Sequence, residues 1–578
     1  MAQKFTQGSG VYLTETDLSS VINPLSTSIG AFVGRASSGP VNTRVFLTRN
    51  QDLISTFGNP NAATLGYGLW GALTFLNESS QTWFVRASSG LELYANTGIL
   101  TSGGSTAQTV SATSTTTTLA TTGYEDGNLP NQILELESFA FSTQLFGVFA
   151  ASPGIDGNNL AVSVITSANA TSAGFDWNFR FDDSGDASPI YGQVFKINVF
   201  LKDSKSSTFN SVSGSPVETF YVSRKQLQDA NKNNLFMEKV INGNSKFIYV
   251  KNNTGIAETT LPSPTGVVAL TGGANASSVS TSDISSGWTL FNDKEKVSVN
   301  ILCCTEAGST SDSTQAAVQT AVGNIAASRK DCIALCQVDG TSATVTNVTT
   351  IITNANYNYN IPSYVANYAG WELIQDVYND RLIYIPNVIY GASLMARNDA
   401  IGEVWTAPAG PNRGQVGSLG LATVWNGTQI GQLRDASINS VKKIQGQGQF
   451  MWSQKTAQRK ASALSDINVR RMLLFVENSI ANSLNSFLDE PNNESTRSRV
   501  RSIINSFLGT VAAGGGLNTD NDAGFFTQCD ATNNPSQVVD NNQLNVNIYL
   551  RPIRVIEFIQ LNAIIVNGSI SFTEITTG

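Results

Sequence analysis

Apolar and polar residues in the first 90 positions alternate in short blocks. Apolar runs bounded by Gly, Ser or Pro are typical of buried strands, whereas leucines spaced three or four residues apart indicate a helix. The pattern predicts strands at 28–35, 45–48 and 82–87, and helices at 50–57 and 62–77. Residues 1–20 are polar and contain glycine, so we interpret them as a terminal arm. The short alternating run in this arm consists of Val11, Tyr12, Leu13 and Thr14.

The next part of the chain has the composition of β structure. Residues 91–147 are nearly free of charge and rich in Thr and Ser, which predicts a small β module or a mobile insertion. Further on, alternating or apolar runs predict strands at 158–166, 193–201, 218–223 and 246–252. A helix is expected near 224–241.

The pattern then changes to alternating strands and helices. Residues 296–304 and 331–339 are nearly continuous apolar runs, and the helical stretch 313–330 lies between them. This order predicts a right-handed βαβ unit with parallel strands. Helices are expected near 343–355, 464–488 and 494–508, followed by strands at 544–550, 556–566 and 569–575. The fold class is therefore mixed, α+β and α/β, with several domains.

Length and charge restrict the function. A chain of 578 residues exceeds what one hydrophobic core usually serves, so about four domains are expected. Only 13% of the residues are charged, against about 25% in average soluble proteins, which favours a surface used largely for self-contacts. The net charge is -8 without a basic stripe, so nucleic-acid contact is not expected. The chain has neither an apolar run of membrane-spanning length nor an apolar signal core at its start, so we expect synthesis in a cytoplasm and no membrane insertion.

Candidate catalytic and metal chemistry is sparse. The chain has no histidine, which excludes His-dependent triads, His general bases and His metal ligands. Five cysteines are an odd number in a reducing compartment, so disulfides are not expected. Four of them could suggest a zinc site, but their spacing matches no zinc knuckle and adjacent strand residues point to opposite faces. We therefore interpret them as small core residues. The five are Cys303, Cys304, Cys332, Cys336 and Cys529.

Three further motifs suggest sites that their contexts do not favour. Residues 66–71 match GxGxxG but lie within a helical pattern, not between a strand and its following helix, so a dinucleotide site is not predicted. Asp376 and Asp380 lie in a turn-rich segment and are interpreted as solvated. Asp182, Asp183 and Asp186 lack the register of a calcium loop. We expect no cofactor, no metal and no enzymatic activity.

Residues 390–410 read YGASLMARNDAIGEVWTAPAG. This small-residue stretch, with its Arg-x-Asp pair and W-x-A-P-A-G run, resembles the tail sheath proteins of contractile-tailed bacteriophages. The matching residues are Arg397, Asp399, Trp405, Pro408 and Gly410. Segments at both ends resemble the same family in the same order, at 10–15, 26–42, 83–87, 467–480, 487–508, 523–530 and 548–559.

The resemblance implies a structural subunit that forms stacked six-subunit rings around an inner tail tube, in a virion assembled in the host cytoplasm. Baseplate and tail terminator proteins are the further partners. Contraction would drive the tube through the host envelope. The sheath of a tailocin or of a bacterial extracellular injection device is the alternative within this class. A β-rich tail adhesin is the alternative from another class, although such a protein would more often show fibrous repeats.

The resemblance also implies a domain plan, in which terminal strands are exchanged between neighbouring subunits. We expect an N-terminal exchange arm at 1–25, an α/β middle domain at 26–90 plus 275–435, the insertion at 91–147, an outward β-rich domain at 148–274 and an inner α/β domain at 436–578. The C-terminal exchange strand contains Ile570, Phe572 and Ile575. The sheet expected to receive an arm contains Val546, Ile548, Leu550 and Phe558.

Overall fold

A computed structural model of the chain contains two compact units, one covering Pro24–Ser479 and one containing Ile480–Gly578. We call these the large unit and the C-terminal unit. The structure describes residues 22, 25–90, 92–100, 105–106, 110–111, 141, 143–166, 191–202, 215–229, 231–242, 244–276, 279–305, 312–339, 346–360 and 363–557.

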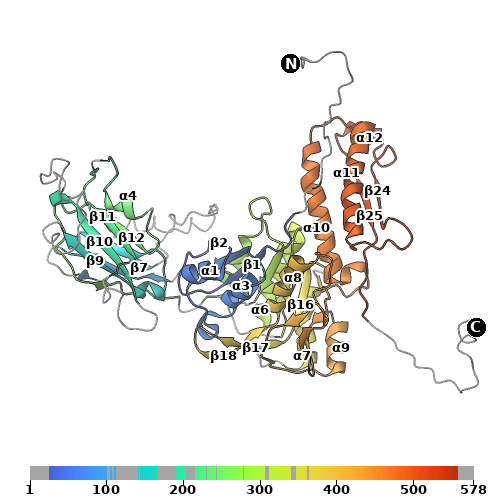
Figure 1. Cartoon of the computed structure of the whole chain (residues 1–578), viewed down its shortest axis with the longest axis horizontal. Coiled ribbons are helices and arrows are strands. Elements are labelled where there is room, and N and C mark those ends of the chain that lie inside the picture. The colour runs from blue at the N-terminus through green and yellow to red at the C-terminus, as the bar shows by residue number, and fades with distance from the viewer. Residues whose placement is uncertain are drawn as a thin grey trace, which may run out of the picture. The chain divides into compact units, whose positions relative to one another are not determined.

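A seven-stranded sheet is the centre of the large unit (Figure 1). Six of its strands are parallel, and only the edge strand β2 is antiparallel to its neighbour. All residues of β1 are buried, as expected for a parallel strand covered on both faces. The strand order is β2 (Arg44–Leu47), β3 (Thr82–Arg86), β1 (Gly30–Gly34), β14 (Ile301–Cys304), β15 (Ile333–Gln337), β16 (Val365–Tyr368) and β21 (Ile438–Asn439).

Helices cover both faces of this sheet. One core contains residues of α3 (Gly68–Leu76) and α8 (Val388–Ile401), and the other contains residues of α5 (Thr281–Thr289) and α6 (Asp312–Arg329). The predicted parallel βαβ unit is confirmed, since β14, α6 and β15 follow each other and the two strands pair in parallel. The sheet also includes β21, so the first strand of the inner domain expected at 436–578 pairs with β16 of the expected middle domain.

Two predicted elements are interrupted or shortened. The expected helix at 62–77 is divided into α2 (Ala62–Leu65) and α3, because Gly66 between them adopts a positive φ of 71°. A Cβ on Gly71 would approach the Phe32 ring to 2.8 Å, so this glycine of the GxGxxG match permits close packing of α3 on β1. The strand expected at 296–304 is confined to β14.

The inserted part of the large unit contains two four-stranded sheets that share one core. Their orders are β11 (Glu218–Val222), β10 (Phe195–Leu201), β9 (Leu160–Thr166) and β13 (Val268–Ala269), and β12 (Ile248–Asn252), β8 (Phe146–Ala150), β5 (Asn96–Ile99) and β6 (Ser105–Thr106). Because β5 pairs with β8, the first strands of the expected insertion at 91–147 belong to the same β body as 148–274. The helix expected at 224–241 is present only as α4 (Met237–Ile241).

Smaller elements complete the large unit. They are α1 (Asn50–Phe57), β4 (Leu93–Tyr94), β7 (Val110–Ser111), α7 (Val348–Asn354), β17 (Trp371–Asp376), β18 (Arg381–Pro386), β19 (Gln415–Val416), β20 (Gly420–Leu421), α9 (Gly427–Asp435), β22 (Val441–Ile444) and β23 (Gly448–Met451). Helix α10 (Ile467–Leu484) begins in this unit and ends in the C-terminal unit.

The C-terminal unit is built around the long helix α11 (Glu494–Ala513), with β24 (Phe525–Gln528) packed against it. The Asn493 side chain accepts a hydrogen bond from the Thr496 amide and caps the start of α11. Strand β25 (Asn547–Leu550) and helix α12 (Ser536–Asp540) follow. Within the part of the chain that the structure describes, no helix has both the length and the hydropathy needed to cross a membrane.

Candidate functional site

Strands β24 and β25 form a two-stranded antiparallel sheet in the C-terminal unit. A sheet of two strands is marginal by itself, and each strand here has one edge that no other described strand pairs with. The inward face carries Phe525, Thr527, Ile548 and Leu550, of which only Thr527 is fully buried. The sheet therefore has the two features that the addition of a further strand requires. One is an open edge, and the other is an apolar face that is only partly covered.

The outward face of this sheet carries two exposed aromatic residues. Phe526 and Tyr549 are direct cross-strand partners, with ring centroids 5.9 Å apart. Phe526 is 60% exposed and Tyr549 is 56% exposed. Exposed aromatic side chains gathered on one face are typical of an interaction surface, because burying them against a partner is strongly favourable.

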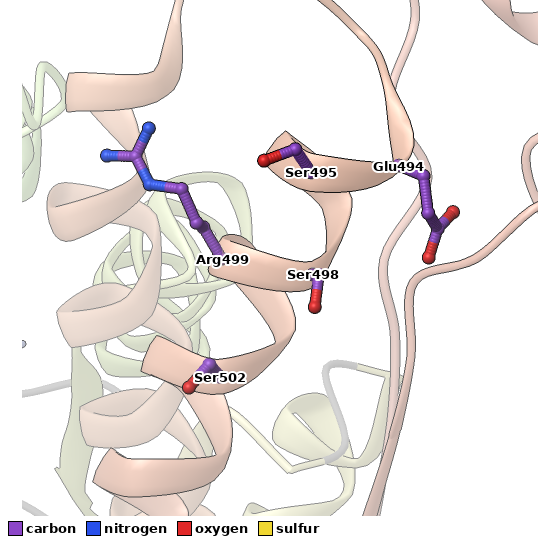
Figure 2. A pocket seen from close by; sticks show the side chains of 5 residues that line it. All are labelled: Glu494, Ser495, Ser498, Arg499 and Ser502. Carbon is purple, nitrogen blue, oxygen red and sulfur yellow. The ribbon is translucent and has the colours of Figure 1, made fainter.

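A shallow hollow lies along the first turns of α11 (Figure 2). It is lined by Glu494, Ser495, Ser498, Arg499 and Ser502. The Arg499 guanidinium lies 5.4 Å from the centre of the Phe487 ring, a cation–π contact. The hollow contains no cluster of buried polar groups, and we assign no ligand to it.

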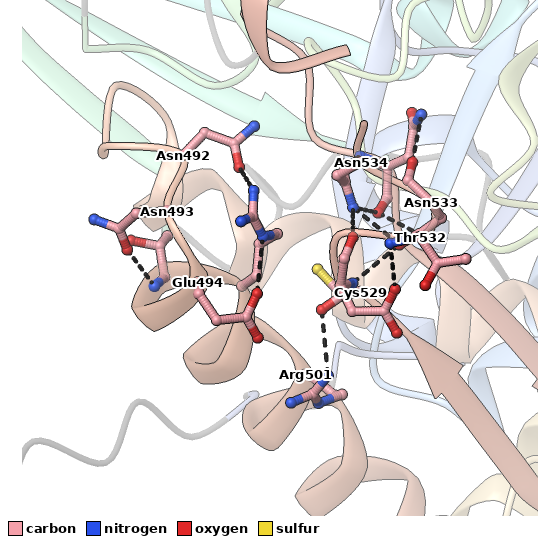
Figure 3. A network of polar contacts seen from close by, with 12 residues as sticks. Asn492, Asn493, Glu494, Arg501, Cys529, Thr532, Asn533 and Asn534 are labelled. Atoms are coloured by element: carbon pink, nitrogen blue, oxygen red, sulfur yellow. Dashed lines mark hydrogen bonds and ion pairs between the residues drawn. The ribbon is translucent and has the colours of Figure 1, made fainter. Parts of the chain in front are cut away.

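A network of side-chain amides holds the loop between β24 and β25 (Figure 3). The buried Asn534 side chain donates to the Asn545 carbonyl at 2.9 Å and accepts from the Asn545 amide at 2.6 Å. Asn533 donates to the carbonyls of Gln528 and Asn545, each at 2.9 Å. Arg501 donates to the Cys529 carbonyl. These bonds tie the loop to the end of β24 and to the residues just before β25.

The structure places part of the expected receiving sheet. Ile548 and Leu550 lie in β25, and Val546 directly precedes it. Phe558, the N-terminal arm residues Val11, Tyr12, Leu13 and Thr14, and the C-terminal arm residues Ile570, Phe572 and Ile575 lie outside the described residues. The pairing of an arm with this sheet therefore stays a prediction.

The Arg-x-Asp pair and the W-x-A-P-A-G run are brought together around the loop that follows α8. Arg397 donates to the Gln415 carbonyl at 2.7 Å. Gly410, with a φ of 83°, pairs through its amide with the Met451 carbonyl. Trp405 packs near Phe475 of α10, and Pro408 is buried. These residues connect α8, β23 and α10.

Asp399 and Arg397 bind different partners. Arg471 of α10 binds its carboxylate with two hydrogen bonds, of 2.9 and 2.6 Å. Ser28, just before β1, donates to the same carboxylate at 2.9 Å. Three segments that are distant in the sequence therefore meet at one buried ion pair.

The four cysteines of the α/β sheet region lie in two different cores. Cys303 belongs to one core of the seven-stranded sheet, and Cys304, Cys332 and Cys336 belong to the other, as the alternation of strand residues predicts. Burial raises the pKa of the Cys303 and Cys336 thiols, which keeps them protonated and inert. No group of three or more metal-binding side chains occurs among the described residues.

Asp376 is not solvated as expected: it is buried and accepts from the amides of Tyr378 and Asn379, capping a hairpin turn.

Glu372 is a buried carboxyl group on β17. Burial raises its pKa from 4.5 to about 8, opposed by a hydrogen bond from Ser418. The Ser418 hydroxyl lies 2.6 Å from one oxygen of Glu372 and also contacts the side-chain amide oxygen of Gln449. One hydroxyl proton cannot serve both acceptors, so a protonated Glu372 that donates to Ser418 satisfies the group.

The Glu372→Gln variant is expected to lose a pH dependence that the wild type shows. The folded state retains the Glu372 proton between pH 4.5 and 8, so the free energy of unfolding falls as the pH rises through this window. Urea unfolding at pH 5 and pH 8.5 should show a loss smaller by about 4 kcal/mol in the variant. The exposed Glu403 supplies the control, Glu403→Gln. Equal losses in wild type and Glu372→Gln would contradict a raised pKa.

Residues 277–457 match the family described as phage tail sheath protein central domain, and residues 459–565 match the phage tail sheath C-terminal domain. The tail sheath protein of Enterobacteria phage T4 is 31% identical over 325 residues, covering 54% of this chain and 49% of that protein. The chain belongs to the phage tail sheath family.

Another tail sheath protein, from Vibrio phage KVP40, is 30% identical to this sheath-family chain over 389 residues, covering 63% of the chain and 55% of that protein. The chain thus spans about half the length of the curated relatives it matches. Crystal structures of sheath tail proteins from Desulfitobacterium hafniense and Listeria innocua each give a TM-score of 0.53 at 10% identity. They cover 90% and 92% of the chain, with 94% and 96% of their own residues aligned. This likeness shows a shared fold, in agreement with the predicted mixed α and β class.

Sequence reasoning missed three residues of this sheath-family chain that the geometry makes prominent. Phe526 and Tyr549 lie within segments that the family resemblance covered, but only the strand register shows that they are cross-strand partners on the exposed face. Arg471 lies on the helical stretch predicted at 464–488 as one of two adjacent arginines. Its burial was the missing signal, because a buried arginine requires an acidic or carbonyl partner.

Proposed function

We propose that the chain is the structural subunit of a contractile tail sheath. Copies polymerise as stacked six-subunit rings around an inner tail tube, in a virion tail assembled in the host cytoplasm. Contraction drives the tube through the host envelope. Baseplate and tail terminator proteins bind the two ends of the sheath. The inserted β body faces outward, and the α/β and C-terminal parts lie toward the tube.

The observation that carries this proposal is the incomplete sheet of β24 and β25. An extended arm from a neighbouring copy can add a strand to an open sheet edge, with backbone hydrogen bonds for affinity and alternate side chains for specificity. The arm containing Val11 and Leu13 and the C-terminal strand containing Ile570 and Phe572 have the required alternation. Their addition completes the sheet, and the matching family domain makes another copy the natural donor.

The strength of one such junction is modest. Five backbone hydrogen bonds contribute about 5 kcal/mol in total at about 1 kcal/mol each. Each buried apolar side chain of the arm adds about 1.5–3 kcal/mol. Many junctions in one lattice act together, so the mesh remains connected while the bodies that it joins change their packing.

Contraction of this kind needs two packings of the same bodies, with the extended one held by a kinetic barrier. The free energy for contraction is stored during assembly, so the chain itself needs no nucleotide. This agrees with a sequence that has no phosphate-binding loop and no histidine.

Negative-stain electron microscopy of the purified, concentrated full chain tests the proposal, with and without the tube protein of the same tail. Striated hollow tubes or stacked rings are the expected result. Single particles in both preparations would contradict it and would favour a tail adhesin.

A further inference from the structure

Residues 25–29 form the root of the N-terminal arm, directly before β1. At its end the Ile29 carbonyl accepts hydrogen bonds from the backbone amides of Asn300 and Ile301, whereas the residues before Ile29 are held by side chains from other elements. The Leu25 amide donates to Ser479 of α10 at 3.4 Å, and the Ile29 amide donates to the Asn300 side chain at 3.2 Å. The carbonyl of Ser28 accepts from Ser79 at 2.7 Å.

The ion pair of Asp399 and Arg471 lies at the middle of the arm root. Arg471 donates to the Thr27 carbonyl at 3.0 Å while binding both oxygens of Asp399. Ser28 donates to Asp399 at 2.9 Å. The side chains of Asp399 and Arg471 are only 5% and 4% exposed, so these charge-assisted bonds are shielded from water.

This arrangement connects the arm root to two helices. Asp399 belongs to α8, most of whose residues are buried, and Arg471 belongs to α10. Ser479, which holds Leu25, is also the last residue of the large unit. Two segments of the chain therefore leave the large unit from positions next to α10. One is the arm root, and the other is the continuation of α10 itself into the C-terminal unit.

We propose that Asp399 and Arg471 anchor the arm root, so that α8 and α10 bear the pull of a neighbouring copy on the arm. Without this anchor the pull would act on β1, whose hydrogen bonds to β3 and β14 hold the centre of the sheet. The claim that α8 and α10 bear the pull rests on the proposed sheath function. The claim that Asp399 and Arg471 anchor the arm root does not, because it concerns contacts within one chain.

The double variant Asp399→Asn with Arg471→Met tests the anchor in the full chain. Replacing both partners leaves no unpaired buried charge, so the fold is retained. Thr27 loses its bond from Arg471, and Ser28 keeps only a neutral amide oxygen as its acceptor. Hydrogen exchange of the monomer should be about tenfold faster at the amides of residues 25–29, with β14 and β15 unchanged. Ser28→Ala removes one bond alone and should give a smaller increase.

Arg329 and Asp331 supply a matched control. Arg329 is also buried, binds its aspartate at 2.7 Å and donates to the carbonyls of Phe291 and Val297, away from the arm root. Its replacement by Arg329→Met with Asp331→Asn should leave exchange at residues 25–29 unchanged.

Tubes of the anchor variant, sheared and measured by electron microscopy, should have a shorter mean length than those of the wild type and of the control. Unchanged exchange at residues 25–29 would overturn the anchor. Faster exchange together with wild-type tube length would overturn the claim that the anchor transmits the pull on the arm to α8 and α10. If the wild type forms no tubes, the sheath function fails, and the exchange measurement still decides the anchor.

Discussion

A chain without residues 1–20 is expected to fold as a monomer and to form no tubes. The described contacts of the large unit begin at Leu25, so the deletion removes none of the described bonds that hold the seven-stranded sheet. It removes the strand that a neighbour's open sheet would bind, and with it about 5 kcal/mol of backbone hydrogen bonds per junction. Sedimentation and electron microscopy measure the loss, and circular dichroism measures the retained fold.

A matched point variant separates the strand from the mere length of the arm. Val11→Asp with Leu13→Asp places charges on one face of the alternating run and should abolish tubes like the deletion. Gln3→Asp with Thr6→Asp adds the same charge outside the run and should assemble normally. Normal tubes from the deleted chain would show that residues 1–20 are dispensable for assembly.

The variant Phe526→Ser with Tyr549→Ser is expected to leave the monomer stable and to raise the concentration needed for tube formation at least about a hundredfold. Both side chains are more than half exposed in the single chain, so their loss changes the free energy of unfolding little. In an assembled lattice, burial of the two rings contributes about 3–5 kcal/mol, which corresponds to a change of two or more decades. Light scattering against protein concentration measures the threshold.

A second cross-strand aromatic pair, of which Phe46 is exposed and Trp83 is partly buried, provides the control for this surface. Phe46 and Trp83 are cross-strand partners in β2 and β3 of the large unit, with ring centroids 4.9 Å apart, and Phe46 is 44% exposed. Phe46→Ser should leave the assembly threshold close to the wild-type value. An equal rise in both variants would mean that general surface hydrophobicity, and not the β24–β25 face, drives assembly.

Local patterns predicted most of the elements, because each depends on neighbours in sequence. The βαβ unit of β14, α6 and β15 and the helix α11 are examples. Pairings between distant segments were not predictable. The 2.9 Å bond of Ser28 to Asp399 joins residues 371 positions apart, and no local periodicity encodes it. The same limit applies to β5 and β8, whose pairing unites two segments that the sequence separated.

Burial of polar groups was the second limit. Asp376 and Glu372 have the same residue types and turn-rich surroundings as solvated carboxylates, and only the packing of β17, β18 and β20 encloses them. The candidate surface was predicted in part. Ile548 and Leu550 followed from strand alternation, whereas the outward pair of Phe526 and Tyr549 depends on the register between two strands.

The order of strands in the central sheet has a consequence for synthesis on the ribosome. β1 lies between β3 and β14, yet β14 leaves the ribosome about 270 residues after β1. At about 5–20 residues per second, the nascent chain waits roughly 15–50 s with an apolar parallel edge unpaired. The β body of β5 to β13 emerges during this interval and has its own core, so it completes its folding first. Nascent chains on neighbouring ribosomes of one messenger RNA can therefore pair wrongly through the open edge of β1. Rapid expression at high ribosome density should favour aggregates over soluble subunits.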